Sequence, residues 1–313
     1  MRALLVEQFG DPESLRVGEL GLPEPGRDEI LVRVLAAGIG PWDVEQIGGG
    51  WKGPLPYVPG AQFAGLVVGD TGCDAGFNDG APVYGWPGPG GCCAQYVTCH
   101  VERLAPLPAG LRVTDAAAVP VGALTADQGI NGILAVKTAD RVLITAAAGG
   151  LGQFAVQMAR ALGAIVVGVS GRRDHELVHR LGAAMVVDQT APDWPDQVRE
   201  MTDGGADKVL ACSAASLPGT ARAARDGATI ATPVRAGLPD ARQIKWRPYE
   251  GRPSGSRLIW MAPRFDDGRL SVSAQAMYFW QEAAQAYRRV ERADSSGQAV
   301  LIVDEDLAAT LEV

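Results

Sequence analysis

Three closely spaced glycines form the clearest candidate for a ligand-binding turn in this sequence. Residues 141–147 (RVLITAA) have the short apolar pattern of a buried strand, and an amphipathic helical pattern begins at Gly152. Glycines let such a turn approach a pyrophosphate closely, and the free N–H groups at the helix start stabilise its charge. Because these glycines stand between a strand and a helix, we predict a dinucleotide site rather than an ordinary turn. Its residues are Ala148, Gly149, Gly150, Leu151 and Gly152.

The end of the next predicted strand, residues 165–170, indicates which dinucleotide binds. An NAD site usually places Asp or Glu there to bind the ribose 2′-hydroxyl. This sequence has Ser170, Gly171, Arg172 and Arg173 instead. A hydroxyl and two guanidinium groups favour a 2′-phosphate, which a carboxylate would repel. The alternative is that the arginines belong to a solvated helix start, but arginine is unfavourable beside the positive end of a helix. We therefore predict NADPH as the cofactor.

The cysteines and histidines have spacings that do not fit a common metal site. An odd number of cysteines without a regular framework indicates free thiols. His175 and His179 have a chelating i, i+4 spacing, but no third ligand is recognisable near them. Four closely spaced thiolates, as in a structural zinc site, are not present either. We predict no metal. The cysteines are Cys73, Cys92, Cys93, Cys99 and Cys212.

Two different patterns of secondary structure divide the chain. The first third has short runs of β-branched residues separated by Gly and Pro, which predicts a β-rich region. From about residue 121 onward, predicted strands alternate with helices, which specifies an α/β fold with a doubly wound parallel sheet. A helix over residues 280–292 and a strand over 299–303 follow. The predicted strands of the parallel sheet are residues 141–147, 165–170, 185–188, 208–212 and 228–232.

Composition excludes several classes of protein. The 313 residues are 47% hydrophobic and 20% charged, as in ordinary globular proteins. A net charge of −8 opposes binding to nucleic acid and to anionic membranes. The longest apolar stretch, residues 161–169, is about half the length of a membrane span. The N-terminal residues lack the pattern of a signal peptide, so we expect a cytoplasmic protein.

With these residues in view, the chain resembles the medium-chain dehydrogenase/reductase superfamily, in its zinc-free quinone oxidoreductase (zeta-crystallin-like) branch. The resemblance covers nearly the whole chain in order, and its motifs are specific only in combination. They are residues 34–43 (VLAAGIGPWD), 57–65 (YVPGAQFAG), 119–126 (VPVGALTA), 146–152 (AAAGGLG), 267–270 (DGRL) and 282–287 (EAAQAY).

The resemblance implies a domain organisation and site residues. A GroES-like β-rich catalytic domain is expected over residues 1–120, a Rossmann NADPH-binding domain over 121–264, and a return segment of the catalytic domain over 265–313. The active site would lie in the cleft between the domains, and the protein would form a homodimer through the edges of its Rossmann sheets. Thr125, Cys212 and Ser213 are expected to contact the cofactor. The expected substrate pocket contains Trp42, Gln62, Trp86 and Trp260, although ordinary packing is an alternative for each tryptophan.

Two positions separate this chain from the zinc-dependent alcohol dehydrogenases of the same superfamily. Their zinc-binding Cys and His correspond to Gly40 and Ala61. The quinone reductases themselves usually have Asn in place of Gly40 and Glu in place of Gln62. Asp43 is a possible proton donor, but an Asp at a helix start more often caps it. Residues 232–265 look shortened and irregular beside the family pattern.

The function that fits these residues is reduction by NADPH without zinc. An alcohol needs a Lewis acid to form its alkoxide, whereas a quinone or an α,β-unsaturated carbonyl needs only a positioned hydride and a proton. We therefore expect a quinone or enoyl reductase, with a polyketide-like substrate as one possibility. The alternatives are a non-redox cyclase or conjugate-addition enzyme in the same pocket, and a binding or structural protein of the crystallin type. The specific substrate and the proton donor stay open.

Overall fold

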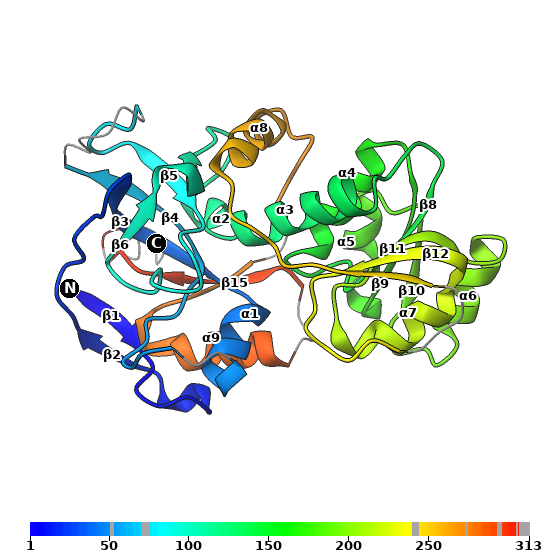
Figure 1. The fold of residues 1–313 in the computed structure, drawn as a ribbon, viewed down its shortest axis with the longest axis horizontal. Coiled ribbons are helices and arrows are strands. Elements are labelled where there is room, and N and C mark those ends of the chain that lie inside the picture. Colours follow the sequence, from blue (N-terminus) through cyan, green and yellow to red (C-terminus); the bar gives the residue numbers. More distant parts are fainter. Residues whose placement is uncertain are drawn as a thin grey trace. The chain divides into compact units, whose positions relative to one another are not determined.

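The computed structural model describes residues 1–50, 53–69, 76–239, 244–272, 275–292, 296–304 and 306. Contacts within the chain divide it into two compact units (Figure 1). Unit 1 contains Met1–Val121 and Pro253–Val313, and unit 2 contains Gly122–Arg252. No helix among the described residues is both long enough and apolar enough to cross a membrane.

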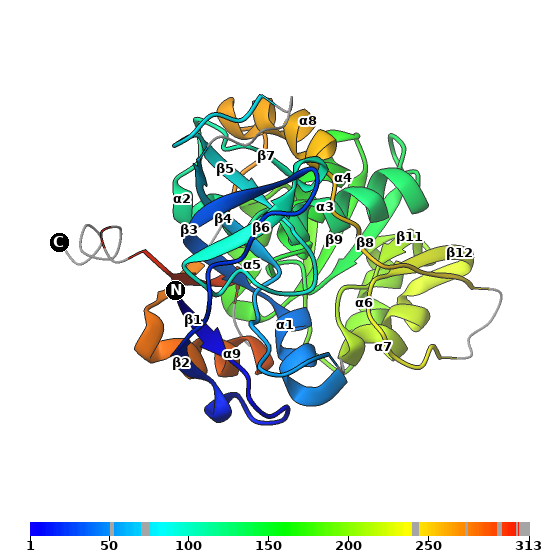
Figure 2. The same ribbon diagram turned by 60° about the vertical axis from the view of Figure 1, so that its left-hand side comes forward.

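Unit 2 is built around a parallel sheet with the strand order β10-β9-β8-β11-β12-β13. When the strands are numbered along the chain, this is the order 3-2-1-4-5-6 of dinucleotide-binding folds. Helices cover both faces, with α3 and α4 on one and α6 and α7 on the other (Figure 2). The strands are β8 (Arg141–Thr145), β9 (Ile165–Ser170), β10 (Met185–Asp188), β11 (Ala206–Leu210), β12 (Ala224–Thr232) and β13 (Lys245–Pro248). The helices are α3 (Pro120–Asp127), α4 (Gly152–Ala161), α5 (His175–Arg180), α6 (Trp194–Met201) and α7 (Leu217–Ala223).

Side chains buried between the sheet and its helices form the core of unit 2. Leu143 of β8, Val167 of β9, Val209 of β11 and Ile230 of β12 have no exposed surface. Burial of each such side chain stabilises the fold by about 1.5–3 kcal/mol. The α/β class and the doubly wound parallel sheet predicted from the sequence are confirmed.

Unit 1 contains a seven-stranded sheet, mostly antiparallel, in which β3 pairs with β4, β6 and β15. Tyr84, Phe63 and Tyr287 are its largest fully buried side chains. The strands of unit 1, including the separate pair β1-β2, are β1 (Arg2–Leu5), β2 (Arg16–Glu19), β3 (Glu29–Ile39), β4 (Gln62–Val68), β5 (Pro82–Gly85), β6 (Tyr96–His100), β7 (Leu104–Pro106), β14 (Gln275–Tyr278) and β15 (Gln298–Ile302). Its helices are α1 (Pro41–Glu45), α2 (Val113–Ala116), α8 (Gly255–Asp266) and α9 (Ala283–Glu291).

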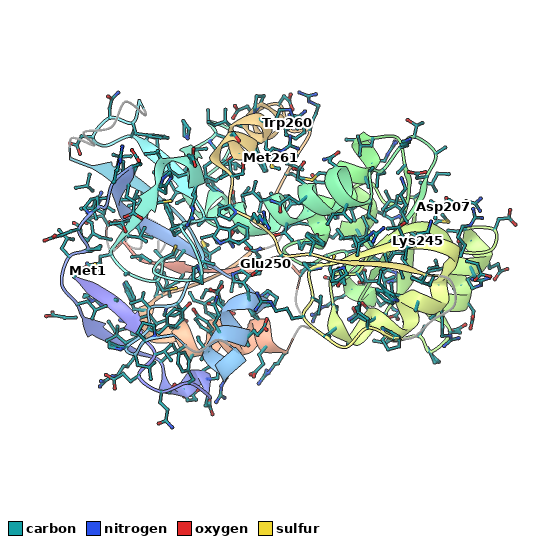
Figure 3. All side chains as sticks on the ribbon, in the orientation of Figure 1. Met1, Asp207, Lys245, Glu250, Trp260 and Met261 are labelled. Carbon is teal, nitrogen blue, oxygen red and sulfur yellow. The ribbon has the colours of Figure 1, made fainter. Side chains whose placement is uncertain are left out.

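Residues 232–265, which the sequence suggested were irregular, contain a regular strand and a regular helix. Strand β13 pairs in parallel with β12, and it runs from Lys245, labelled in Figure 3, to Pro248, two residues before the labelled Glu250. Helix α8 is capped by the Ser254 hydroxyl, which accepts the N–H of Arg257 at 3.3 Å. The prediction was wrong because β13 gains its backbone partners from β12, and α8 gains a buried face from Leu258, Met261 and Phe265.

Helix α8 also shifts the second boundary between the units to Arg252/Pro253, whereas the sequence analysis placed it after residue 264. The helix packs on β7 of unit 1, and the Tyr84 hydroxyl donates to the carbonyl of Leu258 at 3.2 Å. A Cβ on Gly255 would lie 2.3 Å from the carbonyl oxygen of Leu104, so the helix can begin this close to β7 only with glycine there.

A buried carboxylate joins α1 to the turn that precedes β4. Asp43 has no exposed surface, and its two carboxylate oxygens accept the N–H groups of Gly40 at 2.8 Å and Gly60 at 3.1 Å. Asp43 therefore caps α1 from position N3, where its side chain accepts the N–H of the N-cap residue, as in a capping box. Burial raises the pKa of Asp43 to about 7, although these N–H donors lower it.

Replacement of Asp43 by asparagine should change how stability depends on pH. Because the folded protein holds the Asp43 proton more tightly than the unfolded chain, this residue stabilises the fold least at pH values above about 7 and progressively more down to about pH 4. The contribution of Asp43 to the free energy of unfolding changes by at most about 1.4 kcal/mol per pH unit. In urea titrations, the free energy of unfolding of the wild type should therefore fall more between pH 5 and pH 7 than that of Asp43→Asn.

Asp11→Asn is the matched control, because Asp11 also accepts a backbone N–H, from Glu13 at 2.9 Å, but is exposed. Its pH dependence should follow the wild type. If the free energy of unfolding changed with pH in the same way in the wild type and in Asp43→Asn, the raised pKa of Asp43 would be contradicted.

Candidate functional site

The turn between β8 and α4 brings the start of the helix close to the end of the strand. Ala146 follows β8 with a left-handed φ of 48°, and the N–H of Gly149 donates to its carbonyl at 2.9 Å. A Cβ on Gly152 would lie 2.1 Å from the same carbonyl oxygen. Helix α4 can therefore begin directly at the end of β8 only because residue 152 has no side chain.

Three N–H groups at the start of α4 are available to a ligand. The backbone N–H groups of Gly150, Leu151 and Gly152 make no hydrogen bond to any residue that the structure describes. Gly149, Gly150 and Leu151 are partly exposed, whereas Ala148 and Gly152 are buried. The first turn of the ten-residue helix α4 carries no acidic side chain. Free N–H donors at the positive end of a helix fit a phosphate group.

The carboxyl end of β9 lies beside this turn. Thr145 pairs with Val169, and the N–H of Ala147 donates to the Val169 carbonyl at 2.9 Å. Ser170 is buried, and Arg172 and Arg173 begin the short helical turn that follows. Both arginine side chains are exposed, at 86% and 61%. The structure therefore brings the glycine turn and the two predicted guanidinium groups to the same edge of the sheet.

A carboxylate also lies near these arginines. Asp188, at the end of β10, accepts a hydrogen bond from Arg172 Nε at 3.3 Å. The N–H and hydroxyl of Thr190, and then Arg172, hold the pKa of Asp188 below its usual value. Arg173 Nε lies 3.7 Å from the carboxylate of its neighbour Asp174. Exposed pairs of this kind contribute little, so they leave the arginines able to turn toward a bound phosphate.

At the carboxyl end of β11, Cys212 and Ser213 meet two residues that the sequence analysis did not identify. The buried Thr145 hydroxyl accepts the N–H of Cys212 at 3.0 Å, and its oxygen lies at hydrogen-bond distance, 2.9 Å, from the Ser216 hydroxyl oxygen. Ser216 in turn donates to the carbonyl of Ser213 at 2.7 Å. Burial raises the pKa of the Cys212 thiol, which keeps it protonated. Thr145 thus joins the ends of β8 and β11, where the strand order reverses and where such folds bind ligands.

Thr125 lies in α3 with its side chain buried, and its carbonyl accepts a hydrogen bond from the Tyr249 hydroxyl at 2.9 Å. The sequence analysis gave Tyr249 no role, because a bond between residues 124 positions apart leaves no local pattern.

In unit 1, two of the four predicted pocket residues occupy space beside glycines, one in β3 and one directly after it. A Cβ on Gly40 would lie 2.3 Å from the Trp42 ring, so the indole fills the volume of a side chain at position 40. Similarly, a Cβ on Gly38 would lie 2.5 Å from Gln62 Nε2.

The Gln62 amide is fixed in one orientation. Its Oε1 accepts the N–H of Val121 at 2.8 Å, and its Nε2 donates to Gln298 Oε1 at 2.6 Å. A backbone N–H is only a donor, and it therefore determines which end of each amide faces the other. Gln62 has no exposed surface. Gln298 takes part in the same buried pair, although the sequence analysis did not single it out.

The other two predicted pocket residues lie on different elements. Trp86 follows β5, and its Nε1 donates to the carbonyl of Gly88 at 3.1 Å. Trp260 is 43% exposed on α8, whereas the adjacent Met261 is buried (Figure 3). The guanidinium carbons of Arg257 and Arg264 lie 4.3 and 3.5 Å from the centroid of the Trp260 ring.

Metal ligands were also sought among the described residues. No group of three or more His, Cys, Asp or Glu side chains in that part of the chain is arranged to hold a metal. Cys92, Cys93, Cys99 and Cys212 are free thiols, as predicted, and Cys73 lies outside the described residues.

Comparisons with known proteins agree with both halves of this arrangement. The family of alcohol dehydrogenase GroES-like domains matches residues 26–109, and the zinc-binding dehydrogenase family matches residues 150–236. A solved structure described as an NAD-dependent alcohol dehydrogenase is 32% identical, with a TM-score of 0.87, and the match covers 97% of this chain and all of that one.

Curated relatives include a mycocerosic acid synthase-like polyketide synthase from Mycobacterium tuberculosis and the quinone oxidoreductase of Mus musculus. The first is 34% identical over 66% of this chain and 10% of its own length. The second is 30% identical over 66% of this chain and 64% of its own length. This chain thus spans about a tenth of the synthase and less than two thirds of the mouse protein.

The parallel sheet, the glycine turn and the GroES-like region were each expected from the resemblance, and each is confirmed by the fold or by these matches. The chain belongs to the medium-chain dehydrogenase/reductase superfamily.

Proposed function

We propose that this chain is an oxidoreductase that binds a nicotinamide dinucleotide across the carboxyl edge of the unit 2 sheet. The observation that carries the proposal is the start of α4, where the N–H groups of Gly150, Leu151 and Gly152 are free among the described residues. These groups and the helix dipole would hold the pyrophosphate. The cofactor, when bound, supplies the hydride. Ser213 and Thr125 would then contact its nicotinamide half, beyond the point where the strand order reverses.

The cofactor that we propose is NADPH rather than NADH. The solved relative is described as NAD-dependent, but this chain has Ser170, Arg172 and Arg173 at the end of β9. Two exposed guanidinium groups one strand away from the glycine turn support a 2′-phosphate there, because charge-assisted bonds to phosphate are strong. Asp188 accepts a hydrogen bond from Arg172, and a bound 2′-phosphate would compete with Asp188 for this guanidinium group.

The substrate that we propose is a quinone or an α,β-unsaturated carbonyl, reduced without zinc. Gly40 and Ala61 stand where the zinc-dependent relatives have ligands, and neither has a side chain that can bind a metal. A flat, electron-poor substrate needs little activation beyond a positioned hydride and a proton. Trp42, Gln62, Trp86 and Trp260 remain our candidates for substrate contact. We also propose a homodimer.

Removal of the two arginines tests the cofactor choice. The wild type should bind NADPH at least about tenfold more tightly than NADH in calorimetric titrations, because Arg172 and Arg173 meet the 2′-phosphate. The double variant Arg172→Ala/Arg173→Ala should lose this preference through weaker binding of NADPH alone. Arg180→Ala is the matched control, since it removes an exposed, ion-paired arginine from the far end of α5. Equal affinities in the wild type would rule out the proposed role of the arginines.

Transfer of a labelled hydride tests the reaction class. With NADPH deuterated stereospecifically at nicotinamide C4, we expect the label in the product of a quinone or an enone, detected by mass spectrometry. Gly150→Val is the negative control, because a branched side chain in the turn should block the pyrophosphate while the fold persists. Conversion of a substrate with the cofactor unconsumed and no label transferred would replace the reductase with a non-redox enzyme on the same scaffold.

A further inference from the structure

Tyr249 makes two connections at the carboxyl end of the unit 2 sheet. It directly follows β13, and its backbone N–H donates to the carbonyl of Thr232, the last residue of β12, at 3.0 Å. Its side chain reaches α3, where the hydroxyl donates to the Thr125 carbonyl at 2.9 Å. A Cβ on Gly129 would lie 2.6 Å from the Tyr249 oxygen, so the tyrosine occupies space that glycine leaves open.

Gln128 connects the same two segments three residues farther along each of them. Its Nε2 donates to the carbonyl of Arg252 at 2.8 Å, and its Oε1 accepts the N–H of Arg252 at 3.0 Å. The Gln128 amide therefore pairs with both the N–H and the carbonyl of Arg252, in the way that a neighbouring β-strand would. We call the two connections, Tyr249–Thr125 and Gln128–Arg252, the α3 clamp.

Hydroxyl groups continue the same row of hydrogen bonds across the sheet. The Thr232 hydroxyl donates to the carbonyl of Ala211 at 2.9 Å, and the next residue, Cys212, donates its N–H to Thr145 at 3.0 Å. The row thus runs from the end of β8, beside the glycine turn, through the ends of β11 and β12 to Tyr249. Burial raises the pKa of Tyr249 well above its ordinary value, so its hydroxyl stays a neutral donor.

The position of this row indicates which half of the cofactor it serves. A fold with this strand order binds one mononucleotide half on each side of the reversal between β8 and β11. Arg172 and Arg173, at the end of β9, are on the side of the 2′-phosphate and hence of the adenosine. The ends of β11, β12 and β13 are therefore left for the nicotinamide half.

We propose that Tyr249 and Gln128 are positioning residues for the nicotinamide: the α3 clamp fixes Thr125 against the ends of β11–β13, so that this half of the cofactor enters a preformed site. The inference rests on the proposed function, because it assumes that the sheet binds NADPH. We therefore expect affinity for the nicotinamide half to depend on Tyr249 and Gln128, which need not contact the cofactor. A preformed site saves the ordering cost that binding would otherwise include.

The test compares Tyr249→Phe with Tyr84→Phe. Tyr84 is a matched control because its buried hydroxyl also donates to a helix carbonyl, that of Leu258, but belongs to unit 1. Calorimetry would measure two ligands: NADPH, and adenosine 2′,5′-bisphosphate, which lacks the nicotinamide half. For Tyr249→Phe we expect the NADPH dissociation constant to rise about fivefold, in keeping with the loss of one hydrogen bond. The constant for adenosine 2′,5′-bisphosphate should stay unchanged, and Tyr84→Phe should change neither.

A second variant and a second readout make the test independent of one substitution. Gln128→Leu removes the other half of the clamp at a partly buried position and should produce the same split between the two ligands. Hydrogen exchange should show faster exchange in α3 in both clamp variants, with or without nucleotide. An NADPH affinity equal to that of Tyr84→Phe, or an equal loss for both ligands, would overturn the clamp. If the wild type binds neither ligand, the proposed function fails, and the clamp's role toward the cofactor fails with it.

Discussion

The approach of helix α4 to the end of β8 is the constraint on which the proposed cofactor site depends. The helix begins where a side chain at position 152 would lie 2.1 Å from the Ala146 carbonyl oxygen, and the chain turns between them with Ala146 in a left-handed conformation. In this geometry the first N–H groups of the helix find no partner among the described residues. Any larger residue at position 152 would push the helix away and remove the anion site with it.

Around this turn, side chains add hydrogen bonds to the ends of the strands beyond the backbone pairing of the sheet. Hydroxyl groups do this in unit 2, where Thr145 joins β8 to β11 and Tyr249 joins β13 to α3. Such bonds fix backbone groups at the edge where ligands bind without filling that edge with bulky side chains. The second half of the sheet is therefore held in position before a cofactor arrives.

Unit 1 shows how the two departures from the family pattern are accommodated. The space beside Gly40 is filled by the Trp42 ring, and the Gln62 amide forms a neutral pair with Gln298 that the Val121 N–H orients. The loss of polar groups at positions 40 and 62 has thus been matched by apolar packing and a neutral amide pair. A buried carboxylate at position 62 would need a cationic partner, which Gln298 cannot supply.

The sequence predicted what depends on local pattern. The strands of the parallel sheet, the glycine turn and the arginines after β9 each have a periodicity or a spacing that can be read along the chain. Strand β13 and helix α8 were missed because their order comes from β12 and β7, which lie far away in the sequence. The pairings of Gln62 with Gln298 and of Tyr249 with Thr125 join residues 236 and 124 positions apart. Only the fold brings such residues together.

A crystal structure grown with NADPH tests the central claim most directly, namely that the free N–H groups at the start of α4 bind the pyrophosphate. We predict phosphate oxygens within about 3 Å of the backbone nitrogens of Gly150, Leu151 or Gly152, with the nicotinamide over the ends of β11–β13. A bound nucleotide whose phosphates lie elsewhere, with these N–H groups facing only water, would contradict the account.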